Sequence, residues 1–521
     1  MEQKKNARGT VLTAVVLTLL LGLGAVNIPL LSEPVRALRS GETDFRGFTE
    51  AVQTAYTSGF FGKNALIDLN GLFARMTGRQ ICNRVTRLKN GMLTTPYSSC
   101  DVTPLAEGIT ELEAYLRSEG IPFLYVQAPQ KVDTGKTLLR EGVTDFSNEN
   151  ADALLTLLKG SGVETLDLRP AISSTPEQIG QYYFRTDHHW NFTGAFVGFQ
   201  QLVDRLDTLL PGAALDKTYA SMDQWVSHTQ ENAFLGSQGK RTGRFYGGVD
   251  DVTYYTPGFE TTMSCAIPRH RALFKGDFAE ANIRGDYLTE KPDYFAQNPY
   301  AMYIGGDYPL VKHRNSSAPN DLRVLMLKDS YTLPVQAYLS TVVKELDVVD
   351  PRHFTEFTVA EYAAQFRPDA VVLMMNPSTF GEAGYADPGV EQAKKYEEQA
   401  LRQVLPPADV EIQAADSTYN CTAYTTGLEP GKTYELRFAD VCFTAGSAHG
   451  VAAALYEPET KRVLSSEVFD VAYCQENGGF CWQFRTPEEA GDLQLLLYSG
   501  VPGTTQGVGT RYSGVELLRA G

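Results

Sequence analysis

The sequence predicts an α/β protein with a parallel sheet, followed by a smaller β domain. Short apolar segments alternate with segments of helical periodicity between residues 102 and 404, a pattern typical of parallel strands joined by right-handed helical crossovers. Beyond Pro406 and Pro407, short strands separated by Gly, Pro and Asn turns replace this alternation, which indicates a β-sandwich. A long apolar run near the N-terminus adds one membrane-spanning or signal segment.

Five short strands and the helices between them define the predicted α/β region. Strands are expected at residues 121–126, 163–168, 323–327, 345–349 and 370–375. Helices are expected at residues 102–118, 148–159, 194–209, 334–340 and 389–404. Asn90–Gly91 predicts a hairpin turn. We expect the glycine-rich residues 234–248 to form a flexible loop that lines a site, and residues 251–310, rich in Tyr, Phe and Pro, to form an irregular insertion with β character.

The N-terminal residues predict that the rest of the chain lies outside the cytoplasm. Lys4, Lys5 and Arg8 precede Val11–Leu31, a run without charge that is rich in Leu and Val. At about 1.5 Å per residue, such a helix crosses a hydrocarbon core of about 30 Å, and the positive charges favour a cytoplasmic N-terminus. The alternative is a cleaved signal peptide, whose apolar region usually has about 7–15 residues. The length of the run favours an uncleaved anchor.

Four regions follow from these patterns. We expect a cytoplasmic tip with the anchor or signal over residues 1–31, a linker and helices over 32–78, the α/β domain over 79–408 and the β-sandwich over 409–521. Within the second region, residues 32–41 are interpreted as the linker. Residues 45–76 are interpreted as two helices interrupted at 58–62.

The net charge limits the classes of partner that the protein can have, and the cysteine content indicates the compartment in which it lies. Lys plus Arg total 46 against 62 for Asp plus Glu, a formal net charge of −16 in 521 residues, which argues against nucleic acid or anionic lipid as the main partner. The seven cysteines fit an oxidising compartment. Cys82 and Cys100 could form one disulfide bond. Cys421, Cys442, Cys474 and Cys481 could form two more, and the sequence does not determine their connectivity. Cys265 is then left as a buried thiol.

A dense polar cluster lies within residues 184–192. Its core is Asp187-His188-His189-Trp190-Asn191, and such groups are costly to bury unless each has a partner. Residues i and i+2 of an extended segment point the same way, so we expect Asp187 and His189 to share a site, with His188 facing away. Taken alone, the cluster would be interpreted as a surface turn.

Ser330 is the expected partner of this cluster. It follows the apolar strand at 323–327, at the carboxyl end where open α/β sheets place their sites. A serine in a tight strand-to-helix turn presents its hydroxyl beside main-chain N–H groups. His189 would then take the serine proton, and Asp187 would fix the tautomer of the imidazole. The alternative role for Ser330 is an ordinary helix N-cap.

These segments resemble the signatures of a known family. Thr186–Trp190 and Val324–Tyr331 are similar to those of the bacterial DHHW protein family, which is related to the AlgX and AlgJ polysaccharide O-acetyltransferases with SGNH-hydrolase-like domains. The likeness runs from about residue 61 to residue 404. By this resemblance Asp187, His189 and Ser330 are the catalytic residues.

The chain departs from the SGNH pattern at two places. Lys328 stands where these hydrolases have a glycine, and no glycine or asparagine block for the oxyanion hole can be assigned. Asn376 is the candidate side-chain donor to an oxyanion, with the main-chain N–H of Ser330 or Tyr331 as its companion; a turn residue before Pro377 is the alternative for Asn376.

The resemblance implies an extracytoplasmic O-acetyltransferase that passes an acyl group through a serine ester to hydroxyls of a cell-surface or exopolysaccharide. It implies a membrane-bound O-acyltransferase as the acyl donor and a β-sandwich like a carbohydrate-binding module. We expect neither a cofactor nor a metal, since no Cys or His spacing is typical of zinc. An SGNH-type carbohydrate esterase, a non-catalytic glycan-binding protein and a secreted location are the alternatives.

Three further residues are candidate sugar contacts. They are Trp190, Arg241 and Arg244. A core aromatic role is the competing interpretation for Trp190, and solvated loop charges are the competing interpretation for the two arginines.

Overall fold

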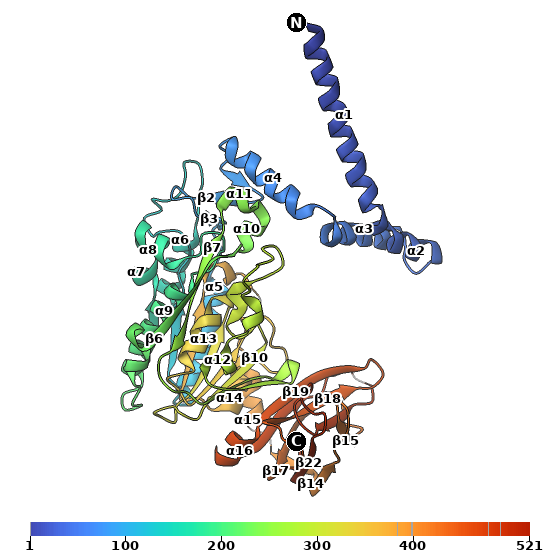
Figure 1. The fold of residues 1–521 in the computed structure, drawn as a ribbon. Helices are drawn as coiled ribbons and strands as arrows, with labels where there is room; N and C mark the ends of the chain where they lie inside the picture. Colours follow the sequence, from blue (N-terminus) through green and yellow to red (C-terminus); the bar gives the residue numbers. More distant parts are fainter. Residues whose placement is uncertain (1, 383, 398–399, 478, 490, 521) are drawn as a thin grey trace. The chain divides into compact units, whose positions relative to one another are not determined.

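The computed structural model describes residues 2–382, 384–397, 400–477, 479–489 and 491–520 (Figure 1). These residues form two units. The first comprises Met1–Arg84 and Gly239–Gly248, and the second comprises Val85–Gln238 and Val249–Gly521. The predicted α/β and β regions therefore both lie mainly in the second unit.

The first unit is mainly helical. Its helices are α1 (Glu2–Asn27), η1 (Ile28–Leu31), α2 (Ser32–Ser40), α3 (Phe45–Gly59), α4 (Lys63–Met76) and α11 (Arg244–Gly247). The predicted break between two helices is confirmed, because Gly62 adopts a φ of 82° just before α4. The predicted linker is wrong: residues 32–40 form α2, which ends at Gly41 in the left-handed conformation that favours glycine.

One helical stretch of the described residues, Thr13–Ser40, is long and apolar enough to cross a membrane. It contains most of the uncharged run that the sequence singled out. Length and composition suit a signal anchor and a signal sequence alike.

The second unit contains an eight-stranded mixed sheet with the strand order β5-β4-β13-β11-β12-β10-β8-β9. The strands are β4 (Phe123–Gln127), β5 (Thr165–Asp167), β8 (Met263–Ile267), β9 (Ala272–Gly276), β10 (Leu310–Asn315), β11 (Arg323–Lys328), β12 (Glu345–Val349) and β13 (Ala370–Met375). From β5 to β12 in this order the neighbours run parallel. The pairs β12–β10, β10–β8 and β8–β9 are antiparallel.

The five predicted strands and their parallel pairing are confirmed, but the sheet as a whole is mixed, because β10, β8 and β9 add antiparallel pairs. Residues 251–310, expected to be an irregular insertion, contribute most of β7 (Asp250–Pro257) and the whole of β8 and β9. Only four residues separate β8 from β9, and so short a connection permits an antiparallel pair but no parallel crossover. β8 is buried and β9 half-buried along their whole lengths, so neither shows the alternation of buried and exposed residues that identifies a strand.

Side chains of the central strands alternate between two hydrophobic cores. Val324 and Met326 lie in one core, and Leu325 and Leu327 lie in the other, because successive residues of a strand point to opposite faces. The first core also takes side chains from α9 (Phe192–Leu209) and α13 (Leu333–Leu339). The second takes them from α5 (Thr103–Ser118), α6 (Ser147–Gly160), α14 (Val359–Phe366) and α15 (Val390–Glu397). α14 was not predicted; the other five helices confirm the predicted ones apart from the end of α15.

The helix expected over residues 389–404 is too long. α15 ends at Glu397, and β14 (Leu401–Ile412) begins shortly afterwards and pairs antiparallel with β22 (Gly509–Ala520). Cross-strand pairing therefore overrides the helical periodicity of residues 401–404. The glycine-rich residues 234–248, expected to be a flexible loop, contain the two short helices α10 (Ser237–Thr242) and α11.

The predicted hairpin at Asn90–Gly91 is confirmed. β2 (Val85–Arg87) pairs antiparallel with β3 (Leu93–Thr94). Gly91 adopts a φ of 86° between them, which is the left-handed backbone that such turns require.

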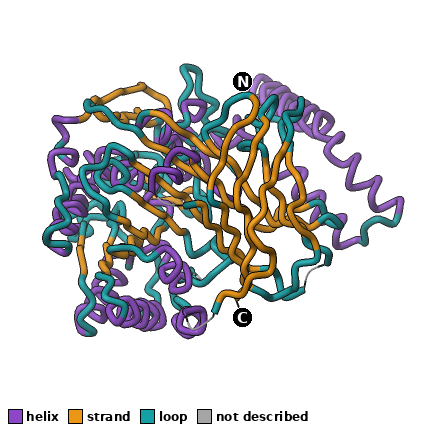
Figure 2. Tube along the Cα trace, turned by 90° about the horizontal axis from the view of Figure 1, so that it is seen from below, coloured by secondary structure: helices purple, strands orange, loops and turns teal. Residues whose placement is uncertain are grey.

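The C-terminal part of the second unit holds two sheets, whose strands are seen side by side in Figure 2. One has the order β14-β22-β16-β20, with β17 also on β22, and the other has the order β15-β21-β18-β19. The remaining bounds are β15 (Cys421–Thr426), β16 (Thr433–Phe438), β17 (Asp440–Ala445), β18 (Gly450–Glu457), β19 (Arg462–Asp470), β20 (Phe480–Arg485) and β21 (Gln494–Tyr498). A single hydrophobic cluster takes side chains from both sheets.

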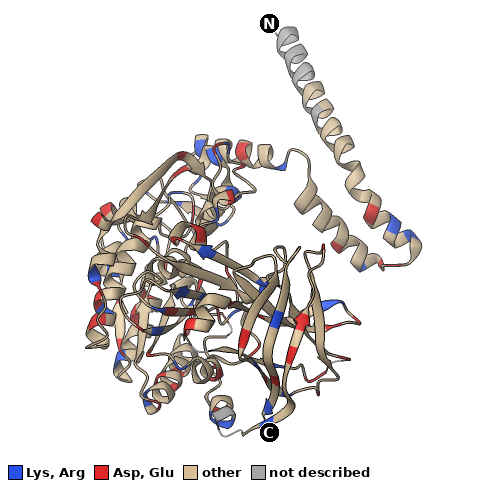
Figure 3. Ribbon diagram, turned by 60° about the horizontal axis from the view of Figure 1, so that its bottom comes forward, with Lys and Arg blue, Asp and Glu red and all other residues tan. Residues whose placement is uncertain are grey.

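All seven cysteines are free thiols, so the expected bridges are not formed. In the C-terminal part the four cysteines lie on four different elements, which are β15, β17, α16 (Val471–Asn477) and β20. Cys265 is buried as expected, and burial raises the pKa of its thiol to about 11. Acidic and basic residues are interspersed along the ribbon of the second unit (Figure 3).

Candidate active site

Ser330 lies directly after the carboxyl end of β11, in the turn η7 (Ser330–Thr332). The buried carboxylate of Asp329 caps this turn by accepting the Tyr331 N–H at 2.9 Å. It also accepts the main-chain N–H of Asn376 at 2.6 Å and the hydroxyl of Thr379 at 3.0 Å. Asp329 therefore links the end of β11 to the segment that follows β13, and so fixes the position of the serine.

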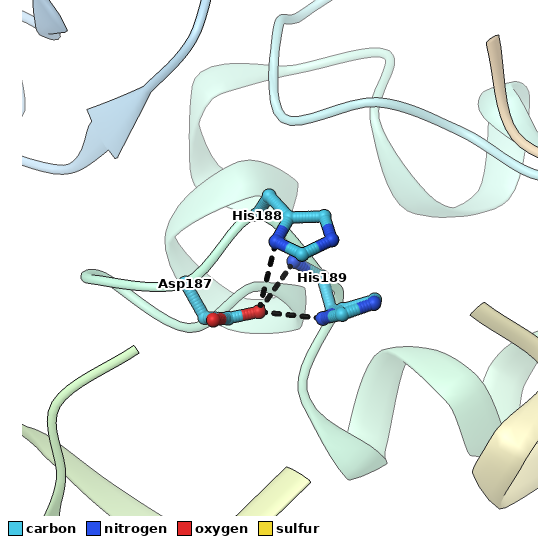
Figure 4. A group of neighbouring side chains, drawn as sticks. All are labelled: Asp187, His188 and His189. Atoms are coloured by element: carbon cyan, nitrogen blue, oxygen red, sulfur yellow. Dashed lines mark hydrogen bonds and ion pairs between the residues drawn. The ribbon is translucent and has the colours of Figure 1, made fainter. Parts of the chain in front are cut away.

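Ser330, His189 and Asp187 form one hydrogen-bonded chain. The Nε2 atom of His189 lies 2.8 Å from Ser330 Oγ, and its Nδ1 atom lies 2.6 Å from Asp187 Oδ1. Figure 4 shows the Asp187 carboxylate beside both imidazoles, with contacts to the ring and the main-chain N–H of His189. Asp187 is 2% exposed and His189 is 7% exposed, so water screens this chain little.

Asp187 is held by groups on both sides of its carboxylate. Ser237 N–H donates to Asp187 Oδ2 at 2.6 Å, and the main-chain N–H of His189 donates to Oδ1 at 3.0 Å. Burial opposes ionisation, but the neighbouring imidazoles and these hydrogen bonds hold the pKa of Asp187 well below its usual range. A Cβ atom at Gly236 would lie 2.3 Å from the Asp187 Cβ atom, so the close approach of this segment requires glycine.

A buried lysine and a buried aspartate support the main chain around Asp187. The Lys131 ammonium donates to the carbonyl oxygens of Leu93 at 2.8 Å and of Arg185 at 3.3 Å, and also to that of Asp187. The Asp250 carboxylate accepts the Thr186 N–H at 2.8 Å. Burial lowers the pKa of Lys131 to about 8, against the opposing effect of the two aspartates.

Two aromatic side chains position the histidine and the serine. The Tyr300 ring is stacked on the His189 ring, with centroids 3.8 Å apart and planes 10° apart. Its hydroxyl donates to the carbonyl oxygens of Ser330 at 3.0 Å and Tyr331 at 3.1 Å. Trp190 is fully buried and donates its indole N–H to Tyr331 O at 2.9 Å. This placement gives Trp190 a supporting position in the core, and its role as a sugar contact stays a prediction.

The expectation that His188 faces away is wrong. Its ring centroid lies 3.7 Å from that of His189, and its Nδ1 atom lies 2.8 Å from Ser237 Oγ. The turn at this segment is tighter than an extended strand, so the alternation of side chains does not hold. Partial burial and the neighbouring His189 lower the pKa of His188 to about 3, which leaves this imidazole neutral at neutral pH.

The expected oxyanion donors have protein partners in this structure. The Tyr331 N–H is taken by Asp329, as described above, and the Asn376 side-chain NH₂ donates to Pro129 O at 2.6 Å. Asn376 also accepts from Gln130 Nε2 at 2.5 Å. Within the described residues, the Ser330 N–H has no acceptor. It is therefore the remaining candidate donor to an oxyanion.

Arg241 and Arg244 lie in the first unit, and both contact protein groups there. Arg244 donates to the Asp68 carboxylate at 2.6 Å and 2.9 Å. Arg241 donates to the carbonyl oxygen of Asn83. Their predicted contact with a sugar gains no support from these positions and stays a prediction.

Asp187, His188 and His189 together offer three metal-ligand atoms within 4.8 Å of one another. Two of those groups, Asp187 and His189, already bind each other. A metal ion at this position would have to replace the hydrogen bond between them. This donor arrangement fits a proton-transfer pair better than a metal centre.

The sequence did not single out Lys131, Asp250 or Tyr300. Gly236 was anticipated only as part of the glycine-rich residues 234–248, which were expected to line a site. One signal was present for Lys131, because it follows the predicted strand at 121–126 and therefore lies near the sheet edge that carries Ser330. Tyr300 lies in the aromatic-rich segment, where nothing distinguishes it from its neighbours.

The hydrogen-bonded Ser330, His189 and Asp187 side chains lie in the second unit, and such an arrangement can activate a serine hydroxyl as a nucleophile. Residues 89–242 match the family model for the SGNH hydrolase-like domain of the acetyltransferase AlgX. This match confirms, for a segment that includes Asp187 and His189, the relationship that the sequence motifs indicated. A search of curated proteins found no significant match.

Several solved structures are similar to the chain. Bacillus cereus PatB1 is 22% identical, covers 57% of this chain and 97% of its own, and has a TM-score of 0.49. A DHHW family protein from Eubacterium siraeum is 18% identical, with coverage of 60% and 96% and a TM-score of 0.45. The O-acetyltransferase domain of Pseudomonas putida AlgJ is 13% identical, with coverage of 60% and 98% and a TM-score of 0.37. Because each TM-score is below 0.5, these likenesses carry no weight in assigning the function.

Proposed function

We propose that the protein is an extracytoplasmic O-acetyltransferase that moves an acyl group through Ser330 to a hydroxyl of a polysaccharide. The observation that carries this proposal is the hydrogen-bonded chain from Ser330 Oγ through the His189 imidazole to the Asp187 carboxylate. A serine hydroxyl is a weak nucleophile until a base accepts its proton, and a buried carboxylate fixes the tautomer that can do so.

The proposed first step forms a serine ester. Ser330 Oγ attacks the carbonyl carbon of the acyl donor while its proton passes to His189 Nε2. The resulting oxyanion needs a donor, and the Ser330 N–H is the one left without an acceptor in the described residues. The leaving group departs with the proton from His189, and the acyl group stays on Ser330 Oγ.

The second step transfers the acyl group to the acceptor. A sugar hydroxyl gives its proton to His189 Nε2 and attacks the ester carbonyl, after which Ser330 Oγ leaves and recovers the proton. A membrane-bound O-acyltransferase is the proposed donor, and the N-terminal apolar helix is proposed to hold the enzyme at the membrane. The family match supports polysaccharide O-acetylation as the general activity.

An esterase uses the same residues, with water in place of the sugar hydroxyl. The two are separated by turnover of an acetyl-ester reporter with and without a neutral oligosaccharide, with products analysed by mass spectrometry. A transferase gives acetylated oligosaccharide and faster reporter turnover when the acceptor is present. Release of free acetate alone, at a rate that the acceptor does not change, assigns an esterase instead. If the reporter is not turned over under either condition, the result supports a glycan-binding protein without catalytic activity.

A further inference from the structure

Helix α4 of the first unit exposes an apolar face. Large apolar side chains recur along it at intervals of three or four residues, and each is between 37% and 77% exposed: Leu66, Leu69, Leu72, Phe73 and Met76. Residues at this spacing lie on one side of an α-helix. A contiguous row of large apolar side chains is costly to leave in water and usually marks an interaction surface.

The opposite side of α4 is packed against the protein itself. Its buried residues are Asp68, Gly71 and Ala74. Helix α11 packs on this side (Figure 1), where Arg244 donates to the Asp68 carboxylate at 2.6 Å. A Cβ atom at Gly71 would lie 2.1 Å from Thr242 O, so the close approach requires glycine. The first unit therefore holds α4 by its small and polar side, and the apolar face points outward.

The start of α4 is tied to the end of the apolar helix α1. The side chain of Asn27, the last residue of α1, accepts the Phe61 N–H at 2.6 Å. A Cβ atom at Gly62 would lie 3.5 Å from the Leu23 Cδ1 atom. Residues 28–60 therefore leave the end of α1 and return to it before α4 begins. In the proposed function α1 crosses the membrane, which puts the first turn of α4 at the membrane surface.

The first unit is basic, although the whole chain is acidic. Residues 1–84 and 239–248 hold 13 Lys and Arg against 6 Asp and Glu, whereas the whole chain holds 46 against 62. The negative charge that disfavours anionic lipid therefore belongs to the second unit. Exposed Lys63 and Arg75 flank the apolar face of α4 by helical spacing, and exposed Arg79 follows the helix. Basic residues beside an apolar helix face suit the headgroups and acyl chains of an anionic membrane.

We propose that α4 lies in the surface of a membrane that contains anionic lipids. Leu69, Phe73 and Met76 would reach about 5–10 Å into the boundary between headgroups and acyl chains. The inference rests on the part of the proposed function that places α1 in the membrane, and it does not depend on acyl transfer. A single spanning helix leaves the first unit free to rotate about the helix axis. A second attachment through α4 would fix the orientation of this unit at the membrane.

The test is fluorescence quenching of the full chain in vesicles of brominated phosphatidylcholine and phosphatidylglycerol. Phe73→Trp adds an indole to the apolar face of α4. The natural tryptophans, Trp190, Trp225 and Trp482, are buried in the second unit and give the baseline. We expect the added emission to shift to the blue and to fall at least about twofold relative to the same vesicles without bromine, because the indole reaches the acyl chains. Omitting phosphatidylglycerol should reduce this quenching.

Three variants control the measurement. Tyr419→Trp places an indole at an exposed aromatic position of the second unit, and bromine should not quench it. In the Phe73→Trp chain, Leu69→Glu puts a charge on the apolar face and should reduce the quenching at least about twofold. Asn64→Glu puts the same charge at an exposed position on the other side of α4 and should leave the quenching unchanged. Folding of each variant is checked by an unchanged thermal midpoint.

Two results would overturn the inference. The first is an unquenched Phe73→Trp in vesicles that carry the chain on flotation. If its emission is then blue-shifted, protein covers the face, either a second copy or another partner. The second is equal quenching in the Leu69→Glu and Asn64→Glu chains. If the chain does not float with the vesicles, both the membrane anchor of the proposed function and this inference fail. If it floats and turns over the acetyl-ester reporter without quenching, only this inference fails.

Discussion

The Nε2 atom of His189 lies 2.8 Å from the Oγ atom of Ser330, although 141 positions separate the two residues in the sequence. The turn before α9 supplies the histidine, and the end of β11 supplies the serine. Asp187 holds His189 and the Asp329 cap holds Ser330. Tyr300 ties the two segments together, because its ring stacks on His189 and its hydroxyl donates to Ser330 O. A change in any of these supports should therefore reduce activity without removing a reacting atom.

Asp187→Asn tests the role of the carboxylate. An amide cannot stabilise the imidazolium that forms when His189 takes a proton, and it favours the wrong tautomer, so we expect kcat/KM for an acetyl-ester reporter to fall by about 10³–10⁴-fold. Asp286→Asn, at an exposed position in η5 (Gly285–Tyr287), is the control and should keep full activity. Near-normal turnover by Asp187→Asn would show that the carboxylate is only structural.

Gly236→Ala tests the close approach of the segment that precedes α10. The added Cβ atom would lie 2.3 Å from the Asp187 Cβ atom, so Asp187 must shift. We expect a loss of at least about 10²-fold in kcat, since small displacements at reacting groups have effects of this size. Gly180→Ala, in α8 (Pro176–Tyr182), meets nothing within 4 Å and should behave like the original protein. Equal activity in the two variants would contradict this account.

Because the pKa of Lys131 is lowered, we expect alkaline pH to have opposite effects on activity and on stability. Above about pH 8 the Lys131 side chain becomes a neutral amine. It then has one N–H group fewer to donate to the surrounding carbonyl oxygens. We expect kcat/KM to fall, because the main chain at Asp187 is held less firmly. The charged groups around it are Asp187 and Asp250, with His188 nearby and neutral.

The contribution of Lys131 to stability changes with pH in the opposite direction to activity. The folded-state pKa of Lys131, about 8, lies below the ordinary value of 10.5, so the unfolded chain binds more protons between these values. The contribution of Lys131 to the free energy of unfolding therefore rises with pH across this window. Lys131→Met should lower activity at pH 7 and remove the alkaline fall near pH 8, as measured by pH–rate profiles alongside thermal unfolding. An alkaline fall that persists in Lys131→Met would assign it to another group.

Trp190→Phe separates a supporting role from a sugar contact. It removes the indole N–H that donates to Tyr331 O at 2.9 Å, so we expect a loss of about 1–3 kcal/mol in the free energy of unfolding and a lower kcat with little change in KM for an oligosaccharide acceptor. Trp225→Phe is the matched control, because Trp225 is also buried and donates to Tyr219 O at 2.7 Å. Trp225→Phe should lower the free energy of unfolding by a similar amount without changing kcat. A rise in KM for the acceptor, with kcat preserved, would instead make Trp190 a sugar contact.

The parts of the fold predictable from the sequence were those with strong local periodicity. β11 and β13 contain short continuous apolar runs, and α5, α6 and α9 carry clear apolar faces, so their positions were confirmed. β12 was also confirmed, although it contains Glu345 and Asp347. β8 and β9 were missed because neither shows an alternation of buried and exposed residues. β10 was missed because it buries the polar side chains of His313 and Asn315. Residues 401–404, the start of β14, were taken for helix because their strand pairing with β22 is a tertiary effect.

The same distinction holds at the site. The segments containing Asp187, His189 and Ser330 were recognisable because they combine a motif with a position at a sheet edge. Tyr300 and Gly236 come from distant segments, and only the folded chain shows that they lie against His189 and Asp187. Asp250 is also distant in the sequence, and it binds the main chain of Arg185 and Thr186 just before Asp187. His188 was misplaced because the local turn could not be read from residue types.

The proposed serine ester is the central claim, and mass spectrometry of the intact protein after brief mixing with an acetyl-ester reporter at low pH tests it most directly. We predict one added acetyl group, mapped to the peptide that contains Ser330 and absent from Ser330→Ala, whose reporter turnover should fall by at least about 10³-fold. Correct folding of Ser330→Ala is checked by an unchanged thermal midpoint. An acetyl group on another residue, or undiminished turnover by folded Ser330→Ala, would contradict the proposed mechanism.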